Sequence, residues 1–136
     1  MAVLQQFMTK DVKTCNPTDD IRQVASIMAE EDVGMVPVEK DGNLIGCVTD
    51  RDIVVKGLAR DLGNNVCAED IMTEKVISGK TDMPVEDASL LMQDHQIRRL
   101  MIVESGKLKG IVSIGDLAAS KQADQAAGNA LSEISR

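Results

Sequence analysis

The sequence predicts an α+β fold in which two β-α-β-β-α repeats pack sheet to sheet with pseudo-two-fold symmetry. Two observations support this prediction. Residues 7–53 overlay residues 71–117 without a gap, and nine of the 47 aligned positions are identical. Within each copy, apolar residues follow first a helical and then a strand periodicity. One copy is too small to bury a core alone, so the two copies are expected to pack together.

The identical positions include glycines and acidic residues that fall in register in both copies. They pair Met8 with Met72, Thr9 with Thr73, Val12 with Val76, Met28 with Met92, Gly42 with Gly106, Leu44 with Leu108, Gly46 with Gly110, Val48 with Val112, and Asp52 with Asp116. We therefore interpret the chain as a tandem duplication.

Each copy begins with a short apolar segment, at Val12 or at residues 76–77, and a polar turn follows it. Apolar residues then recur at the i, i+3, i+4, i+7 spacing of a helix that buries one face. This stripe consists of Ile21, Val24, Ala25 and Met28 in the first copy, and of Val85, Ala88, Ser89 and Met92 in the second.

Two further apolar runs in each copy predict a β-hairpin. The runs cover residues 35–38 and 44–48 in the first copy, and residues 100–103 and 108–112 in the second. Asp41-Gly42 and Ser105-Gly106 lie between the runs, and Asp-Gly in this setting is a strong signal for a tight turn. A second helix is expected over residues 50–60 and from Gly115 onward.

These elements divide the chain into five parts. We expect an N-terminal extension over residues 1–6, the first repeat over 7–60, a linker over 61–70, the second repeat over 71–120, and a tail over 121–136. The tail is rich in Ala, Ser and Gln. Its pattern leaves open whether it extends the last helix or frays.

Composition argues against several classes of protein. One aromatic residue and a net charge of −7 argue against nucleic-acid binding, which favours basic surfaces and stacking platforms. No apolar run approaches the roughly 18 residues of a membrane span, and no secretory signal is visible, so we expect a cytoplasmic protein without membrane partners. Three widely spaced cysteines and one histidine argue against a zinc site or a disulfide framework.

Chemistry-bearing residues gather where the last strand of each copy meets its second helix. Thr49 and Asp52 stand three residues apart in the first copy, and Ser113 and Asp116 in the second. A carboxylate there can accept both hydroxyls of a ribose, while the hydroxyl and the first-turn N–H groups favour a phosphate. The same spacing is also that of a capping box, in which these side chains only satisfy the start of the helix. The spacing alone leaves both roles open.

The chain resembles a tandem pair of CBS motifs, the cystathionine-β-synthase-type module also called a Bateman module, in its standalone form. The resemblance rests on Met8-Thr9 and Met72-Thr73, on the stretches 46–52 and 110–116, and on the stretch 97–103. It covers residues 7–120. Two departures weaken the match in the second copy, where Met101 replaces the usual proline and Ile114-Gly115 stands in place of Asp50-Arg51.

The resemblance implies a regulatory module that binds AMP, ADP, ATP or S-adenosylmethionine in clefts between the two repeats and transmits occupancy to a partner protein. It also implies a homodimer. No other cofactor and no metal is expected. The ligand contacts that it favours are Thr49, Arg51, Asp52, Ser113, Asp116, Arg98 and Arg99 for ribose and phosphate, and Val12, Val36, Val76 and Leu100 for an adenine slot.

Arginine suits the phosphate role because its guanidinium group can hold phosphate through two hydrogen bonds. Arg98 and Arg99 can equally be surface charges. Residues 7–53 carry five Lys or Arg against ten Asp or Glu, a net charge of −5, whereas residues 71–117 carry six against seven, a net charge of −1. We therefore expect the second copy to tolerate phosphates better.

The sequence argues against an enzyme. It holds a single histidine and no GxxxxGK[ST] phosphate loop, and the partners of a Ser-His-Asp or Cys-His set are missing. The leading prediction is a ligand-sensing regulatory module. The alternative is a structural protein-interaction module whose clefts hold no nucleotide.

Overall fold

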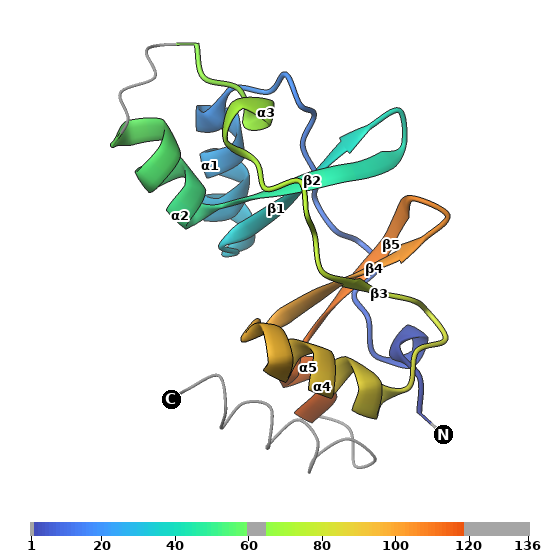
Figure 1. The fold of residues 1–136 in the computed structure, drawn as a ribbon. Coiled ribbons are helices and arrows are strands. Elements are labelled where there is room, and N and C mark those ends of the chain that lie inside the picture. Colours follow the sequence, from blue (N-terminus) through green and yellow to red (C-terminus); the bar gives the residue numbers. More distant parts are fainter. Residues whose placement is uncertain (1, 60–64, 119–136) are drawn as a thin grey trace. The chain divides into compact units, whose positions relative to one another are not determined.

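A computed structural model describes residues 2–59 and 65–118 of the chain (Figure 1). Its elements are, in order, η1 (Leu4–Gln6), α1 (Ile21–Glu31), β1 (Met35–Lys40), β2 (Asn43–Thr49), α2 (Asp50–Asp52), η2 (Ile53–Leu58), α3 (Ala68–Ile71), β3 (Ser78–Gly79), α4 (Val85–His95), β4 (Arg99–Glu104), β5 (Lys107–Ser113) and α5 (Ile114–Ala118). Both halves combine helices with an antiparallel strand pair, which confirms the predicted α+β class. The expected tail over residues 121–136 lies outside the described residues.

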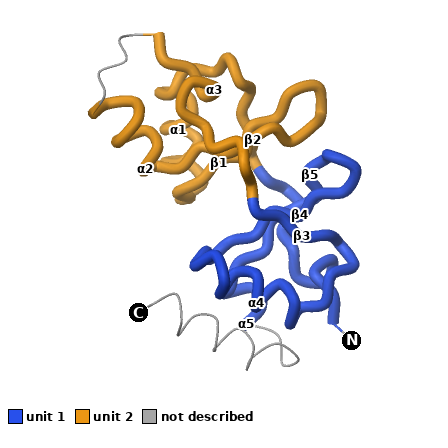
Figure 2. The backbone as a smooth tube through the Cα atoms, in the orientation of Figure 1, with its two compact units in different colours: residues 1–12, 77–136 blue, residues 13–76 orange. Residues whose placement is uncertain are grey.

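The chain forms two compact units whose limits differ from those of the sequence repeats. Residues 13–76 form one unit, which we call the middle unit. Residues 1–12 join residues 77–136 in the other, which we call the terminal unit (Figure 2). The first residues of each repeat therefore belong to the unit that contains the rest of the other repeat.

The middle unit is built on the antiparallel pair β1–β2, in which Met35 lies opposite Thr49. The strand predicted around Val12 is reduced to a single parallel bridge between Cys15 and Val38. The buried core of this unit is aliphatic and consists of Cys15, Val24, Met28, Val36, Val38, Val48, Val66, Ala68 and Ile71.

The terminal unit contains a three-stranded sheet in the order β3-β4-β5. β3 runs parallel to β4, with Ser78 opposite Met101, and β4 runs antiparallel to β5. The strand predicted at residues 76–77 therefore lies slightly later in the chain, at Ser78–Gly79. The buried core consists of Ala2, Leu4, Val85, Ala88, Met92, Leu100, Ile102, Val112, Ile114 and Leu117.

Both hairpin turns have the backbone geometry that their sequences predict. Asp41 and Gly42 have φ angles of 54° and 81°, and Ser105 and Gly106 have φ angles of 52° and 79°. Positive φ at both central residues is the mark of a type I′ turn, whose twist matches that of the flanking strands. The predicted hairpins are confirmed in both copies.

The predicted helical stripes are confirmed with one exception. In α4, all four stripe residues are buried. In α1, Val24 and Met28 are buried, but Ala25 is exposed. Ile27 and Ile21 pack against the core of the middle unit instead, so the buried face is rotated away from Ala25. The prediction for Ala25 was wrong because the face of α1 that meets the core carries Ile21, Val24, Ile27 and Met28, and Ala25 lies outside it.

The helix predicted over residues 50–60 is not a uniform α-helix. One α-helical turn, α2, continues as the π-helical segment η2, in which the N–H group of Ala59 donates to the carbonyl of Val54, five residues back. Gly57 is buried here, and a Cβ atom on it would lie 3.2 Å from Cδ1 of Ile21. The lack of a side chain at Gly57 thus allows the segment to lie close to α1.

The segment that opens the first repeat completes the terminal unit. The Leu4 N–H donates to the carbonyl of Met83 at 3.0 Å. Thr9 and Ile111 exchange two backbone hydrogen bonds of 2.8 and 3.0 Å. Leu4 is fully buried, so residues expected to be an N-terminal extension supply part of the core.

The segment that opens the second repeat completes the middle unit in the same way. The Ala68 N–H donates to the carbonyl of Asp19 at 2.8 Å. Thr73 and Cys47 exchange two backbone hydrogen bonds of 2.8 and 3.0 Å. Ala68 begins α3, a helical turn within the stretch expected to be a linker. Each of these hydrogen bonds has an equivalent in the terminal unit, between residues 64 positions away in the sequence. Since Ala68 is equivalent to Leu4, the structural repeat begins earlier than residues 7 and 71.

Two glycines permit these contacts. A Cβ atom on Gly46 would lie 2.8 Å from the carbonyl oxygen of Thr73, and one on Gly110 would lie 2.6 Å from that of Thr9. Both distances are shorter than a van der Waals contact, and backbone atoms cannot withdraw as the end of a flexible side chain can. Glycine is therefore required at both positions by the close approach of another chain segment.

We expect Gly110→Ala to lower the free energy of unfolding by about 2 kcal/mol, because the added methyl group forces the segment around Thr9 away from β5. Gly115→Ala is the matched control, since its Cβ would meet only the Ser113 Oγ, at 3.6 Å. Urea unfolding followed by circular dichroism measures both. Equal stability of the two variants would contradict the close-approach argument.

Candidate functional site

Two strand–helix junctions hold the residues singled out from the sequence. The middle junction, Thr49–Asp52, joins β2 to α2. The Thr49 N–H donates to Oδ2 of Asp52 at 2.9 Å, and the Asp52 N–H donates to Oγ1 of Thr49 at 3.0 Å. Asp52 is only 8% exposed. The capping box that the sequence offered as one alternative is present, and it holds the carboxylate in a fixed position.

The terminal junction, Ser113–Asp116, joins β5 to α5 and repeats this geometry. The Ser113 N–H donates to Oδ2 of Asp116 at 2.9 Å, and the Asp116 N–H donates to Oγ of Ser113 at 3.0 Å. Asp116 is half-buried, so its carboxylate is more accessible than that of Asp52. Each reciprocal pair leaves the second carboxylate oxygen, Oδ1, outside the cap.

The backbone donors expected to face a phosphate differ between the junctions. At the middle junction, the N–H groups of Asp50, Arg51 and Asp52 are all paired, with the Gly34 carbonyl, with Oδ1 of Asp50 and with Oγ1 of Thr49. This junction thus does not offer the free first-turn donors that its sequence suggested.

At the terminal junction, the Ile114 N–H donates to the carbonyl of Arg98 at 3.0 Å. The Gly115 N–H has no hydrogen-bond partner among residues 2–59 and 65–118. Among the described residues, this junction therefore keeps a backbone donor without a partner, at Gly115, which is exposed.

The structure brings the predicted arginines Arg98 and Arg99 to the terminal junction. Arg99 begins β4 and lies directly opposite Ser113 in the β4–β5 register, and the Arg98 carbonyl is bonded to Ile114. Both arginines are exposed, as is Arg51 on α2 of the middle junction. The predicted ribose and phosphate residues therefore fall into two sets, one in each unit.

The four residues predicted to form an adenine slot lie in different environments. Val36 and Leu100 are fully buried in the cores of their units. Val12 and Val76 are half-buried. The described structure gives Val36 and Leu100 a packing role beside the junctions, since Val36 lies opposite Val48 and Leu100 opposite Val112. The slot itself stays a prediction.

Sequence reasoning missed Lys56. Its Nζ lies 3.2 Å from Oδ1 of Asp52 and donates to the carbonyl of Ile71 at 3.3 Å. The ammonium group thus pairs with the one carboxylate oxygen that the cap leaves over. The i, i+4 spacing of Asp52 and Lys56 along a helix could have indicated this ion pair.

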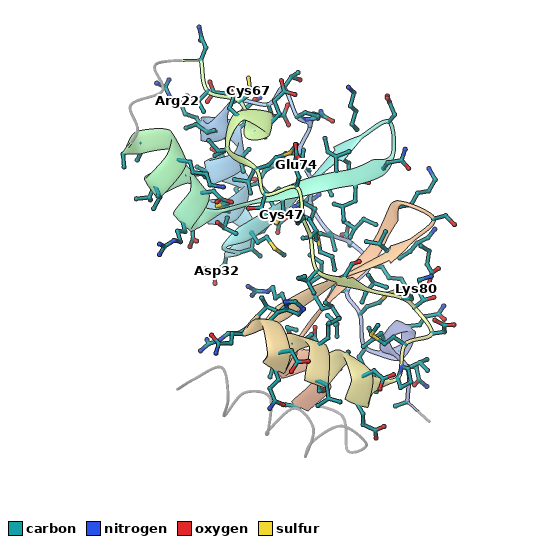
Figure 3. All side chains as sticks on the ribbon, viewed as in Figure 1. Arg22, Asp32, Cys47, Cys67, Glu74 and Lys80 are labelled. Atoms are coloured by element: carbon teal, nitrogen blue, oxygen red, sulfur yellow. The ribbon has the colours of Figure 1, made fainter. Side chains whose placement is uncertain are left out.

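The cysteines do not have the properties of reactive or metal-binding thiols. Cys15 and Cys47 are buried, and Cys67 is half-buried. Figure 3 labels Cys47, on β2, and Cys67, just before α3. Burial raises the pKa of Cys15 to about 11, with a contribution from Asp19, and raises the pKa of Cys47 to about 11, with a contribution from Asp52. These thiols stay protonated near neutral pH, which makes them poor nucleophiles and poor metal ligands.

Neither a metal site nor a membrane span is found in the part of the chain that the structure describes. No group of three or more His, Cys, Asp or Glu side chains there is placed to hold a metal ion. No helix there is long and apolar enough to cross a bilayer.

Comparison with known proteins identifies CBS domains in both repeats of the chain. The family model described as "CBS domain" matches residues 4–57 and again residues 68–122. The CBS domain-containing protein YhcV of Bacillus subtilis is 41% identical over 135 residues, which cover 99% of this chain and 96% of that protein.

Two solved structures share both fold and sequence similarity with the chain. The crystal structure of Hypoxic Response Protein I with two coordinated zinc ions has a TM-score of 0.78 at 30% identity, and the match covers 88% of this chain and 98% of that one. The CBS domain pair of protein MJ0100, in complex with 5′-methylthioadenosine and S-adenosyl-L-methionine, has a TM-score of 0.76 at 26% identity, with 88% and 94% covered.

We expect Cys15 and Cys47 to react slowly with a thiol reagent in the folded protein at pH 8. A pKa raised from 9.0 to about 11 lowers the thiolate fraction roughly a hundredfold. Peptide mapping by mass spectrometry measures labelling at each cysteine, with the urea-unfolded chain as reference. The rate should rise steeply as the pH approaches 11, and rapid native labelling of Cys47 at pH 8 would contradict the burial argument.

Proposed function

Because the chain belongs to the CBS domain family and carries two such domains in tandem, we propose that it is a regulatory module that binds an adenosine-containing ligand. The candidates are AMP, ADP, ATP and S-adenosylmethionine. The ligand occupies one or both of the strand–helix junctions, and the module transmits its occupancy to a partner protein. We place its action in the cytoplasm.

The observation that carries this proposal is the fixed carboxylate at each junction. Asp52 and Asp116 are both oriented by a backbone N–H bond to Oδ2, and an oriented carboxylate is the group that holds the two hydroxyls of a ribose. The MJ0100 pair, a relative in sequence and fold, was solved with two adenosine-type compounds. That relative supports an adenosine ligand for this chain.

The remaining predicted residues take complementary roles in the proposal. Thr49 and Ser113 orient the carboxylates through the capping boxes. Arg51 serves phosphates at the middle junction, and Arg98 and Arg99 serve them at the terminal junction. Val12, Val36, Val76 and Leu100 form or support the apolar surroundings of the adenine. The proposal requires no catalytic residue, no metal and no further cofactor.

A second candidate function is a protein-interaction module that holds no nucleotide. It is favoured by the capping boxes themselves, because reciprocal hydrogen bonds give Asp52 and Asp116 a sufficient structural role without any ligand. The two candidates differ in one respect that can be measured, namely whether removal of the carboxylate charge abolishes a ligand effect.

We also propose that the module acts as a homodimer. Val54, Val55 and Leu58 are 55%, 40% and 68% exposed, and all three lie on η2. An apolar cluster on one helical segment is typical of a surface that packs against another molecule. A second copy of the chain is the proposed occupant.

Thermal unfolding in the presence of each adenosine compound tests the ligand proposal. A ligand at 100 times its dissociation constant adds about 2.7 kcal/mol and raises the midpoint by several degrees. We expect one compound to do so, and the double variant Asp52→Asn/Asp116→Asn to lose the effect, because asparagine keeps a capping oxygen but loses the charge.

The matched control is Asp41→Asn/Asp94→Asn, which makes the same change in charge at two exposed residues, one in the β1–β2 turn and one on α4. It should retain the ligand-dependent increase in the midpoint. Absence of any increase with all compounds, in a folded protein, would reject the sensor and favour the interaction module.

Leu58→Asp is expected to convert the dimer into a monomer, because a charge replaces the most exposed side chain of the apolar cluster. Light scattering after size exclusion measures the mass. Leu90→Asp is the control, since Leu90 is 57% exposed but lies on α4, outside the cluster. A wild-type chain that is monomeric at all concentrations would refute the homodimer.

A further inference from the structure

Two methionines hold equivalent positions in the segments that open the two repeats. Met8 and Met72 are 64 residues apart in the sequence, and each directly precedes the threonine that pairs with β5 or β2. A Cβ atom on Gly110 would lie 3.1 Å from Sδ of Met8, and one on Gly46 would lie 2.9 Å from Sδ of Met72. Each thioether therefore lies against the bare backbone of a strand glycine.

The same two side chains also contact the cores. Met8 packs against the core of the terminal unit, and Met72 packs against the core of the middle unit. Each side chain thus attaches an opening segment to the unit that the segment completes, one residue before the backbone hydrogen bonds that do the same. A change in the polarity of either sulfur acts directly on this attachment.

Both side chains are partly open to solvent, so a small oxidant can reach them. Met8 and Met72 are half-buried. Three other described methionines are almost inaccessible, with exposed fractions of 8% for Met28, 0% for Met92 and 3% for Met101. Methionine oxidation depends on access to the sulfur, so Met8 and Met72 are expected to react before these three.

Two further described methionines are half-buried but differ in their contacts. Met35 begins β1 and is not among the side chains that pack against the described cores. Met83 packs against the core of the terminal unit, but it lies outside the opening segments, and the equivalent residue of the first repeat is Asp19. Met35 therefore provides a control, and Met83 an alternative that the experiment has to separate.

The reaction expected at these sulfurs is a two-electron oxidation by a peroxide. A lone pair of the thioether sulfur attacks one oxygen of hydrogen peroxide, so that an S–O bond forms and the O–O bond breaks. The departing hydroxide takes up the proton of the transferred oxygen and leaves as water. The sulfur is oxidised to a sulfoxide, and the peroxide is reduced.

The sulfoxide oxygen does not fit the site that the thioether occupies. On the side of the glycine, the strand backbone already lies in contact with the sulfur. Toward the core, the oxygen would be a polar group in apolar surroundings, which is costly without a hydrogen-bond partner. Hydration of the oxygen requires the side chain to turn outward and leave the core. Each of these outcomes weakens the attachment of the opening segment.

We propose that Met8 and Met72 form a duplicated oxidation site, through which a peroxide loosens both opening segments. Oxidation of Met8 destabilises the terminal unit, and oxidation of Met72 destabilises the middle unit. The modification is reversible, because methionine sulfoxide reductases restore the thioether. This inference goes beyond the proposed function, since it holds whether or not the chain binds a nucleotide.

Graded treatment of the full chain with hydrogen peroxide tests the proposal. Peptide mapping by mass spectrometry should show sulfoxide at Met8 and Met72 before it appears at the three buried methionines. As these two residues become oxidised, the midpoint of thermal unfolding should fall by about 5 to 10 °C. Treatment with the two methionine sulfoxide reductases should restore the original midpoint.

The variant Met8→Leu/Met72→Leu assigns the effect to these two sulfurs. Leucine has a similar volume and cannot form a sulfoxide, so the untreated variant should unfold within a few degrees of the wild type. It should also lose most of the fall in midpoint that peroxide causes. Met35→Leu is the matched control, which removes one half-buried sulfur outside the attachments and should retain the full effect.

Hydrogen exchange on the wild type gives a second readout that does not depend on how the variant folds. Oxidation should lower the protection of the backbone amides of Thr9, Ile111, Cys47 and Thr73, since these form the hydrogen bonds next to the two sulfurs. Amides in the centre of α4, which lie apart from the opening segments in the chain, should lose less protection.

Three results would overturn the proposal. The first is complete oxidation of Met8 and Met72 with no change in the midpoint or in amide protection. The second is an undiminished effect of peroxide on Met8→Leu/Met72→Leu, which would transfer the effect to Met83 or another residue. The third is slower oxidation of Met8 and Met72 than of the buried methionines.

Discussion

Each repeat of this chain is completed by the segment that opens the other repeat, and the rest of the structure depends on that exchange. Backbone hydrogen bonds join Thr9 to Ile111 and Thr73 to Cys47. In each case the opening segment passes so close to a glycine of the strand that a side chain at that glycine would collide with it. Buried residues of the same segments, among them Leu4, fill the cores. Because every unit needs residues from both repeats, neither repeat contains a complete core of its own.

The exchange also sets the position of the candidate site residues. β2 and β5 are held by the crossing segments, and each strand ends directly at a capping box whose carboxylate is thereby fixed. At the middle junction the connection is closer still, since Lys56 joins Asp52 to Ile71 at the end of α3. The carboxylate of Asp52 is thus buried, hydrogen-bonded in the cap and paired with a lysine at the same time.

Duplication has preserved the backbone of the two junctions and changed their charges. The hairpin turns, the register shifts and the reciprocal caps agree between the units. The side chains at equivalent positions differ, with Gly34 against Arg98 and Lys56 against Ser120. Backbone geometry of this kind tolerates such changes, because the cap uses only the Thr or Ser hydroxyl and the Asp. A duplicated fold can therefore hold two chemically different sites.

The sequence by itself determined the features that depend on neighbours along the chain. The turns at Asp41-Gly42 and Ser105-Gly106, the α4 stripe and both capping boxes follow from spacings of at most one or two helical turns. The repeat follows from the comparison of the sequence with itself at an offset of 64 residues. Tertiary structure alone decided which segment completes which unit, why Ala25 is exposed, and why Val36 and Leu100 are core residues. These three features depend on contacts between residues that are far apart in the sequence. Which residues come into contact depends on how the surfaces of the elements fit together, and local sequence patterns do not contain that information.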